Sequence, residues 1–396
     1  MVEIDRFAFD RSEEGILLTH TIFDLQMSPV NGEVYLASFN PCGDASIGCW
    51  GNARIDRFRV TSSTIEHIGP AFKFDPATAA ADGAPRCAED DFGFPGQFGA
   101  CAPSDFTFSP DGTRVYVDED NDDYVEIFEV LANGNLAFIR TATEAPTSNH
   151  GFEISNDGQY LYHSENVFRI DGDNLTQVNS GNVGTQQLLL NSGLLVAIAA
   201  GQLRIYDLDD PAVPNELGRA QFNENALDFG TLDGNRFVIS GRSMIAVAEW
   251  DGTDFTVLDE LAVADGDMPG GGTRRMSVRG IDVFRQGGEL YAVAAMFARG
   301  DDEDFDINPA FIRGYRVASD GTLTEVWSEP VSGQARSVML AGGSQRISGQ
   351  SVGSIQFQPA VEPLAVPTNA VWALLALLLL IGTIGVRQLR SRRQAV

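Results

Sequence analysis

The stretch SPDGTRVYVDEDNDDYVEIFEV, residues 109–130, predicts the architecture of most of the chain. It contains a turn with Gly112, a strand with alternating apolar residues, and a second strand of the same kind. Glycine accepts the left-handed backbone that tight hairpin turns require. Because a single unit of this size cannot bury its faces alone, we expect neighbouring units of similar sequence.

The same pattern of strand, glycine turn and strand recurs seven times. Its copies begin at Phe23, Asp105, Gly151, Leu188, Leu227, Ile281 and Arg336, with turn glycines Gly32, Gly112, Gly158, Gly193, Gly234, Gly288 and Gly343. These glycines are 80, 46, 35, 41, 54 and 55 residues apart, and intervals of about 40 to 50 residues are typical of propeller blades. The sequence therefore predicts an all-β fold, a seven-bladed β-propeller over residues 1–359, followed by one C-terminal transmembrane helix.

The N-terminus indicates how the ring closes. The motif IDRF occurs at residues 4–7 and again at residues 55–58, where it opens the third strand of the first complete blade. The chain is thus expected to begin in the middle of a blade. Either the last blade, ending at residues 354–359, is completed by this N-terminal hairpin, or two upstream strands are missing, and both can hold together.

Four cysteines form two local pairs inside an insertion at residues 41–104. They are Cys42 with Cys49 and Cys87 with Cys101. Such pairs in Gly/Pro-rich loops are typical of disulfides in exported proteins, and closing the longer loop would stabilise the fold by about 3 kcal/mol. Four unrelated reduced thiols are the alternative. A zinc site is less favoured, because neither pair has the short CxxC spacing and only His67 lies nearby.

The last residues differ in composition from the body. After a linker at 360–366, residues 367–386 contain no charged side chain and are long enough as a helix to cross a bilayer. A basic tail, 387–396, follows and carries Arg387, Arg390, Arg392 and Arg393. By the positive-inside rule these arginines stay cytoplasmic and the propeller lies outside. The N-terminus shows no signal peptide, so we expect an upstream one that starts the export.

The body resembles known propeller families. The stretch from Ser109 to Val130 is similar to blades of the YVTN-type and lactonase-like seven-bladed propellers, and LRIYDLDDPAVPNELG, from Leu203, is similar to the LVIVD repeat of bacterial surface propellers. These resemblances imply the fold and leave the activity open. In lactonase-like propellers a histidine often opens an innermost strand near the central channel, and His150 holds that position here. An ordinary blade-stabilising histidine is the alternative.

The tail resembles the IPTL-CTERM sorting signal of Gram-negative bacteria. The matching residues are Val366, Pro367, Thr368 and Trp372, followed by the apolar helix and the arginine cluster. Asn369 stands where the family has leucine. The resemblance implies an exosortase-like enzyme as partner, cleavage near the motif, and delivery to the cell surface.

Two acidic loops are candidate cation sites. Alternating carboxylates at Asp118, Asp120 and Asp122, and again at Asp302, Asp304 and Asp306, suit a hard cation such as calcium. Neither loop has the glycine and distant glutamate of an EF-hand, so solvated surface charge is the alternative.

The overall charge and the missing motifs limit the function. A formal net charge of −28 repels phosphate backbones and excludes nucleic acid as a partner. No nucleophile elbow, P-loop, HExxH or dinucleotide fingerprint occurs. The sequence therefore favours a binding or structural module, exported and displayed on the cell envelope, with an unknown surface or matrix ligand. The alternative is a lactonase-like hydrolase that works at the channel mouth with His150 and nearby acids.

Overall fold

A computed structural model describes most of the predicted propeller. The described residues are 21–39, 54–60, 64–73, 103–119, 122–144, 151–164, 166–180, 183–190, 193–267, 273–274, 276–286, 288–298 and 310–331. This part of the chain is all β and forms six four-stranded antiparallel blades, each with its strands in sequence order. The seventh predicted repeat, from Arg336, lies outside the described residues, so the blade count of seven stays a prediction.

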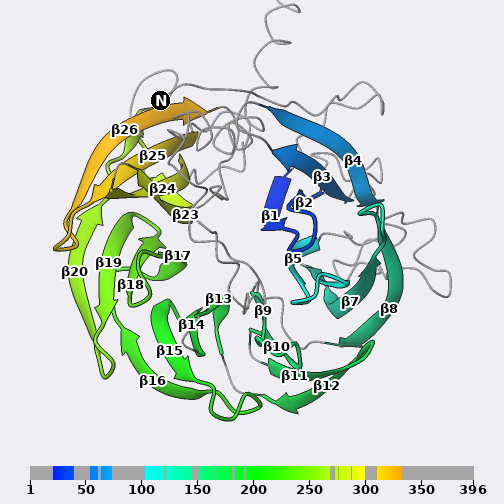
Figure 1. Ribbon diagram of the computed structural model, residues 1–396. Helices are drawn as coiled ribbons and strands as arrows, with labels where there is room; N and C mark the ends of the chain where they lie inside the picture. The colour runs from blue at the N-terminus through cyan, green and yellow to red at the C-terminus, as the bar shows by residue number, and fades with distance from the viewer. Residues whose placement is uncertain are drawn as a thin grey trace, which may run out of the picture.

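The blades follow one another around a ring (Figure 1). Blade 1 comprises β1 (Thr21–Met27), β2 (Val34–Phe39), β3 (Arg54–Val60) and β4 (Ile65–Lys73); blade 2 comprises β5 (Pro103–Phe108), β6 (Arg114–Glu119), β7 (Asp122–Val130) and β8 (Leu136–Glu144). Blade 3 comprises β9 (Phe152–Ile154), β10 (Tyr160–His163), β11 (Asn166–Asp171) and β12 (Asn174–Asn179); blade 4 comprises β13 (Thr185–Leu189), β14 (Leu194–Ala199), β15 (Gln202–Asp207) and β16 (Asn215–Ala220). Blade 5 comprises β17 (Ala226–Thr231), β18 (Arg236–Gly241), β19 (Met244–Trp250) and β20 (Phe255–Ala262); blade 6 comprises β23 (Met276–Gln286), β24 (Glu289–Ala298), β25 (Ala310–Val317) and β26 (Leu323–Val331). A short pair, β21 (Gly266–Asp267) and β22 (Thr273–Arg274), connects blades 5 and 6.

The first strand of each blade lies nearest the centre of the ring, and the fourth forms the outer rim (Figure 1). Six predicted hairpins are confirmed as the first two strands of the six blades. Their turn glycines all have a positive φ, between 67° and 86°. Among the described residues, apolar clusters join each blade to the next one along the chain, from blade 1 to blade 6. One such cluster, for example, joins Tyr35 and Ile55 of blade 1 to Phe106 and Phe128 of blade 2.

The two faces of the ring differ in their connections. The antiparallel register places the end of each second strand beside the start of the first, as with His163 opposite Phe152. The starts of the first and third strands and the ends of the second and fourth strands therefore lie on one face, which we call the connection face. The tight glycine turns lie on the opposite face, which we call the turn face.

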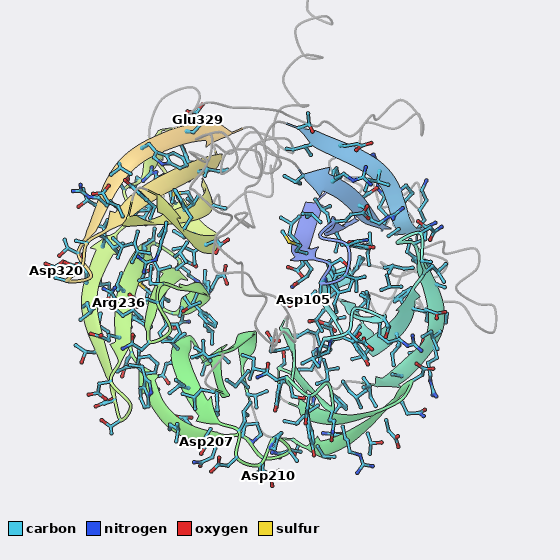
Figure 2. The ribbon with its side chains drawn as sticks, in the orientation of Figure 1. Asp105, Asp207, Asp210, Arg236, Asp320 and Glu329 are labelled. Atoms are coloured by element: carbon cyan, nitrogen blue, oxygen red, sulfur yellow. The ribbon has the colours of Figure 1, made fainter. Side chains whose placement is uncertain are left out.

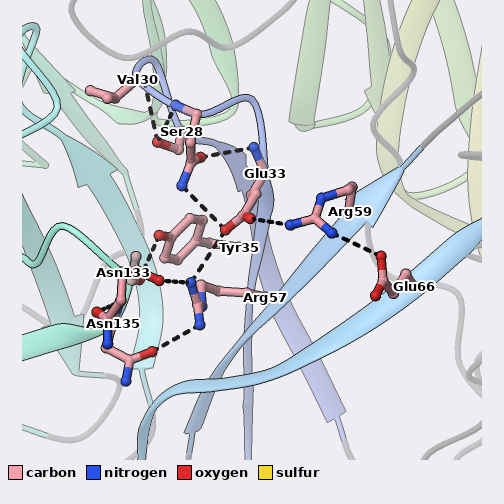
Figure 3. Close-up of polar contacts among 11 residues, drawn as sticks. Ser28, Val30, Glu33, Tyr35, Arg57, Arg59, Glu66, Asn133 and Asn135 are labelled. Atoms are coloured by element: carbon pink, nitrogen blue, oxygen red, sulfur yellow. Dashed lines mark hydrogen bonds and ion pairs between the residues drawn. The ribbon is translucent and has the colours of Figure 1, made fainter.

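On the turn face, a polar network joins blade 1 to blade 2 (Figure 3). The Tyr35 hydroxyl donates to the Gly134 carbonyl at 2.7 Å, and the Arg57 guanidinium donates to the Asn133 carbonyl at 2.5 Å and to Asn135 Oδ1 at 2.8 Å. Glu33 accepts a further hydrogen bond from Arg57 at 3.3 Å. Since Arg57 is only 7% exposed, these bonds are shielded from water and hold the two blades in register.

Candidate functional site

Five of the six described inner strands carry a buried carboxylate. These residues are Asp24 on β1, Asp105 on β5, Glu153 on β9, Asp228 on β17 and Asp282 on β23. Their exposed fractions lie between 2% and 9%. Figure 2 shows Asp105 at the inner edge of the ring, whereas Asp207, Asp210, Asp320 and Glu329 lie at its outer rim. We call these five buried residues of the inner strands the carboxylate ring.

The backbone of the inner strands explains why acids are held there. An inner strand has a neighbour on one edge only, so some of its N–H groups need another acceptor. Asp105 Oδ1 accepts the Phe106 N–H at 2.8 Å, and Asp282 Oδ1 accepts the Val283 N–H at 2.7 Å. Each carboxylate thus satisfies the amide that follows it in the sequence.

Two members of the ring also connect neighbouring blades. Asp228 Oδ2 accepts the Ile281 N–H of blade 6 at 2.9 Å, and Asp24 Oδ2 accepts the Phe106 N–H of blade 2 at 3.4 Å. Hydrogen bonds of an ionised carboxylate to backbone amides are stronger than neutral ones. The carboxylate ring therefore has a structural role, which any catalytic role has to accommodate.

The interface between blades 2 and 3 adds further ionisable groups to this ring. Asp105 lies directly opposite Asp118 of β6 in the antiparallel register. Asp118 Oδ1 is 3.4 Å from His163 Nε2 of β10. The His163 ring is fully buried and stacks on Phe152 with centroids 4.7 Å apart. This places two carboxylates and an imidazole together beside the centre of the ring.

The three residues of this group come from two neighbouring blades and are all buried. Side chains directly opposite each other in an antiparallel pair lie close together, so the Asp105 and Asp118 carboxylates interact directly, and the His163 imidazole lies beside Asp118. Tyr116 also packs at this interface, and burial raises the pKa of its hydroxyl to about 12, so it stays protonated at neutral pH. Asp105 is the most exposed of the three residues, at 6%, so its carboxylate is the candidate to meet a bound molecule.

A second histidine–carboxylate pair lies farther from the centre. His67 Nε2 is 2.7 Å from Asp56 Oδ1, and Arg54 Nε is 2.6 Å from Asp56 Oδ2. Asp56 and His67 belong to β3 and β4, the outer half of blade 1. Because Arg54 neutralises the buried Asp56, we interpret the His67–Asp56 pair as a structural contact.

The predicted site residues are only partly within the described residues. Asp118 is buried and faces His163. The described residues do not include the side chains of Asp120 and Asp122 or any of residues 302–306. Within the part of the chain that the structure describes, no group of three His, Cys, Asp or Glu side chains could hold a metal ion. Calcium therefore stays a prediction. His150, the four cysteines and every residue of the tail also lie outside the described residues, and no helix that could span a bilayer occurs among the described ones.

Sequence reasoning did not single out Asp105 or His163, although a signal for the carboxylate ring was present. An acid is followed by an apolar residue in five inner strands, as in FDL at 23–25, SDF at 104–106 and LDF at 227–229. His163 gave no such signal, because its partner Asp118 belongs to another blade.

Comparisons with known proteins identify the fold. No family model matches the chain, and no curated protein matches its sequence. The periplasmic gluconolactonase of Pseudomonas aeruginosa is similar in structure, with a TM-score of 0.50, 14% identity, and coverage of 77% of this chain and 84% of that one. A candidate 6-phosphogluconolactonase of Bacteroides fragilis gives a TM-score of 0.49, 14% identity, and coverage of 82% and 85%.

The structural neighbours are thus lactonase-like β-propellers. Only the first of the two reaches a TM-score of 0.5, and at 14% identity it shows the fold alone. The activity has to be argued from the residues of this chain.

Proposed function

We propose that this protein is a lactonase-like hydrolase whose active site lies at the centre of the connection face. The observation that carries the proposal is the buried group Asp105, Asp118 and His163 at the inner edge of a lactonase-like propeller. The structural neighbours support this alternative more than a binding or structural module. The hydrolase expected from the sequence used His150 together with nearby acids, whereas this proposal assigns the reacting group to Asp105.

Asp105 is suited to act as the general base. It belongs to an inner strand and keeps 6% of its surface exposed, whereas Asp118 and His163 are 2% and 0% exposed. Asp105 takes a proton from a water molecule, and the water oxygen bonds to the lactone carbonyl carbon. The ring C–O bond then breaks, and the leaving alkoxide receives the proton from Asp105. One water is consumed for each lactone, and the product is a hydroxy acid.

Asp118 and His163 are positioning residues in this scheme. Asp118 is the cross-strand neighbour of Asp105, and the stacking of His163 on Phe152 fixes the imidazole against Asp118. Fixed neighbours of this kind hold a catalytic carboxylate in one orientation.

The proposal is tested by lactone hydrolysis with the full chain in a pH-stat, which records the acid released. D-Glucono-δ-lactone and γ-butyrolactone are the substrates, and heat-denatured protein gives the background rate. We expect turnover of at least one lactone well above background. A rate equal to background for both lactones, with protein whose far-ultraviolet circular dichroism shows a folded β structure, would overturn the proposal.

We further propose that the propeller is exported and anchored in the cell envelope by residues 367–386, with an exosortase-like enzyme as partner. The apolar run, the four arginines after it and the motif around Pro367 and Trp372 support this location. Protease treatment of intact cells tests it. Cleavage of the propeller only after the cells are lysed would contradict the proposal.

A further inference from the structure

Thr107 lies on the same face of the inner strand β5 as Asp105. Successive side chains of a strand point to opposite faces, and the pairing of β5 with β6 continues without a shift after Asp105. Phe106, between the two residues, packs in the apolar cluster shared with blade 1. Asp105 and Thr107 therefore both face blade 3, the side on which Asp118 meets His163.

The Thr107 hydroxyl is buried and needs a hydrogen-bond partner. The residue is 0% exposed, and its Oγ1 has no such partner in the part of the chain that the structure describes. Buried polar groups are normally hydrogen-bonded, either to protein or to ordered water. A buried water requires at least two polar partners, and the Asp105 carboxylate, two residues away on the same face, offers the second one.

The spacing of the two side chains suits a single bridging water. Residues two apart on a strand have Cα atoms about 6.7 Å apart, and a water with two hydrogen bonds of about 2.8 Å spans up to about 5.6 Å. The two side chains need to lean toward each other by only about 1 Å in total. An ionised carboxylate has about four acceptor positions, so Asp105 can bind a water in addition to the Phe106 N–H and its other protein contacts.

We propose that Thr107 is a positioning residue whose hydroxyl holds the water molecule that Asp105 activates. This inference rests on the proposed function and deepens it. The water donates one hydrogen to the Asp105 carboxylate and the other to Thr107 Oγ1, so its oxygen lone pairs remain free for the lactone carbonyl carbon. When the new C–O bond forms, the proton passes to Asp105, and Thr107 keeps its own proton throughout. A nucleophile that is already oriented reacts faster than one that has to be ordered first.

Three variants of the full chain test the role of the hydroxyl. Thr107→Val has nearly the same shape without the hydroxyl, and Thr107→Ser keeps the hydroxyl. Thr231→Val is the matched control. Thr231 lies on the inner strand β17 of blade 5, and its Oγ1 is likewise buried and without a hydrogen-bond partner among the described residues.

The assay is the pH-stat measurement of kcat and KM, with whichever of the two lactones gives the faster turnover. For Thr107→Val we expect kcat to fall by about 10- to 100-fold with KM nearly unchanged, because displacement of a reacting group by about 1 Å costs up to about 100-fold. Thr107→Ser and Thr231→Val should keep most of the activity. Far-ultraviolet circular dichroism checks that each variant is folded.

The outcomes separate this inference from the proposed function. Equal kcat in Thr107→Val and Thr231→Val would overturn the inference and leave the hydrolase intact. An equal loss in Thr107→Ser and Thr107→Val would also overturn it, since the shape of the side chain would then matter and the hydroxyl would not.

If the unaltered protein hydrolyses neither lactone, the proposed function fails, and the melting temperature of Thr107→Val tests the water site alone. Loss of a hydroxyl that binds a buried water lowers the melting temperature, whereas loss of a dry, unsatisfied hydroxyl raises it. A melting temperature equal to or above that of the unaltered protein would refute the water site.

Discussion

Replacing Gly134 by alanine tests the contact that joins blade 1 to blade 2. Gly134 lies in the turn between β7 and β8 with φ of 82°, and a Cβ there would collide with Arg57 Nη1 and press on the Tyr35 hydroxyl. A non-glycine residue in this backbone region costs about 1 to 2 kcal/mol. Displacing the guanidinium from Asn133 and Asn135 adds about 1.5 to 3 kcal/mol, since both hydrogen bonds come from a charged donor.

Gly134→Ala is therefore expected to lower the free energy of unfolding by about 2.5 to 5 kcal/mol. The matched control is Gly172→Ala, in the corresponding turn of blade 3, where φ is 63° and no atom lies within 4 Å of the added Cβ. The free energy of unfolding of Gly172→Ala should fall only by the backbone cost of about 1 to 2 kcal/mol. Urea titration followed by circular dichroism measures both. Equal losses in the two variants would refute the idea that the Arg57 network stabilises the interface.

Three further properties can be checked on the same protein. Hydrogen bonds from Asp254 and Thr253 lower the pKa of Asp251, and hydrogen bonding from Thr322 lowers the pKa of Asp320. A carboxylate whose pKa is lower in the folded than in the unfolded protein stabilises the fold above about pH 4, and this stabilisation is lost as the pH falls further. The variants Asp251→Asn and Asp320→Asn should therefore show a smaller decrease in melting temperature between pH 5 and pH 3 than the unaltered protein. With a net charge of −28, the melting temperature should rise between 0.05 M and 1 M potassium chloride as self-repulsion is screened, and an unchanged value would contradict this. Burial raises the pKa of Tyr116 and of Tyr315 to about 12. In an absorbance titration at 295 nm, these two hydroxyls should still be protonated at pH 11, where exposed tyrosines ionise. Ionisation of all tyrosines at pH 11 in folded protein would contradict the burial of these two side chains.

The sequence predicts the blades because their signals are local. In the turn from Ser109 to Arg114, the serine hydroxyl donates to Asp111 at 2.6 Å, and Asp111 accepts the Thr113 N–H at 3.0 Å. The turn from Ser155 to Tyr160 repeats these contacts through Asp157, at 2.6 Å and 3.0 Å. These two hairpins are thus encoded within a few residues, and all six predicted hairpins share a turn glycine with a positive φ, which is a local signal as well.

The candidate site depends on contacts between blades and could be predicted only in part. Asp118 was expected to bind a cation in its own loop, yet its side chain turns to His163, 45 residues later in the sequence. No local pattern specifies that pairing, because it arises only when blades 2 and 3 pack face to face. Asp105 was accessible to sequence reasoning through the acid that recurs before an apolar residue in the inner strands.

The central claim is that Asp105 activates water for lactone hydrolysis, and one comparison of variants tests it most directly. Asp105→Asn keeps the acceptor for the Phe106 amide and removes the base. Asp259→Asn on the outer strand β20 is the matched control, since Asp259 likewise accepts the following N–H, at 2.9 Å, and one from the next blade, Leu323, at 2.8 Å. Loss of a general base lowers kcat by roughly 100-fold or more. The account predicts such a loss in Asp105→Asn and nearly full activity in Asp259→Asn; equal activity in the two variants would contradict it.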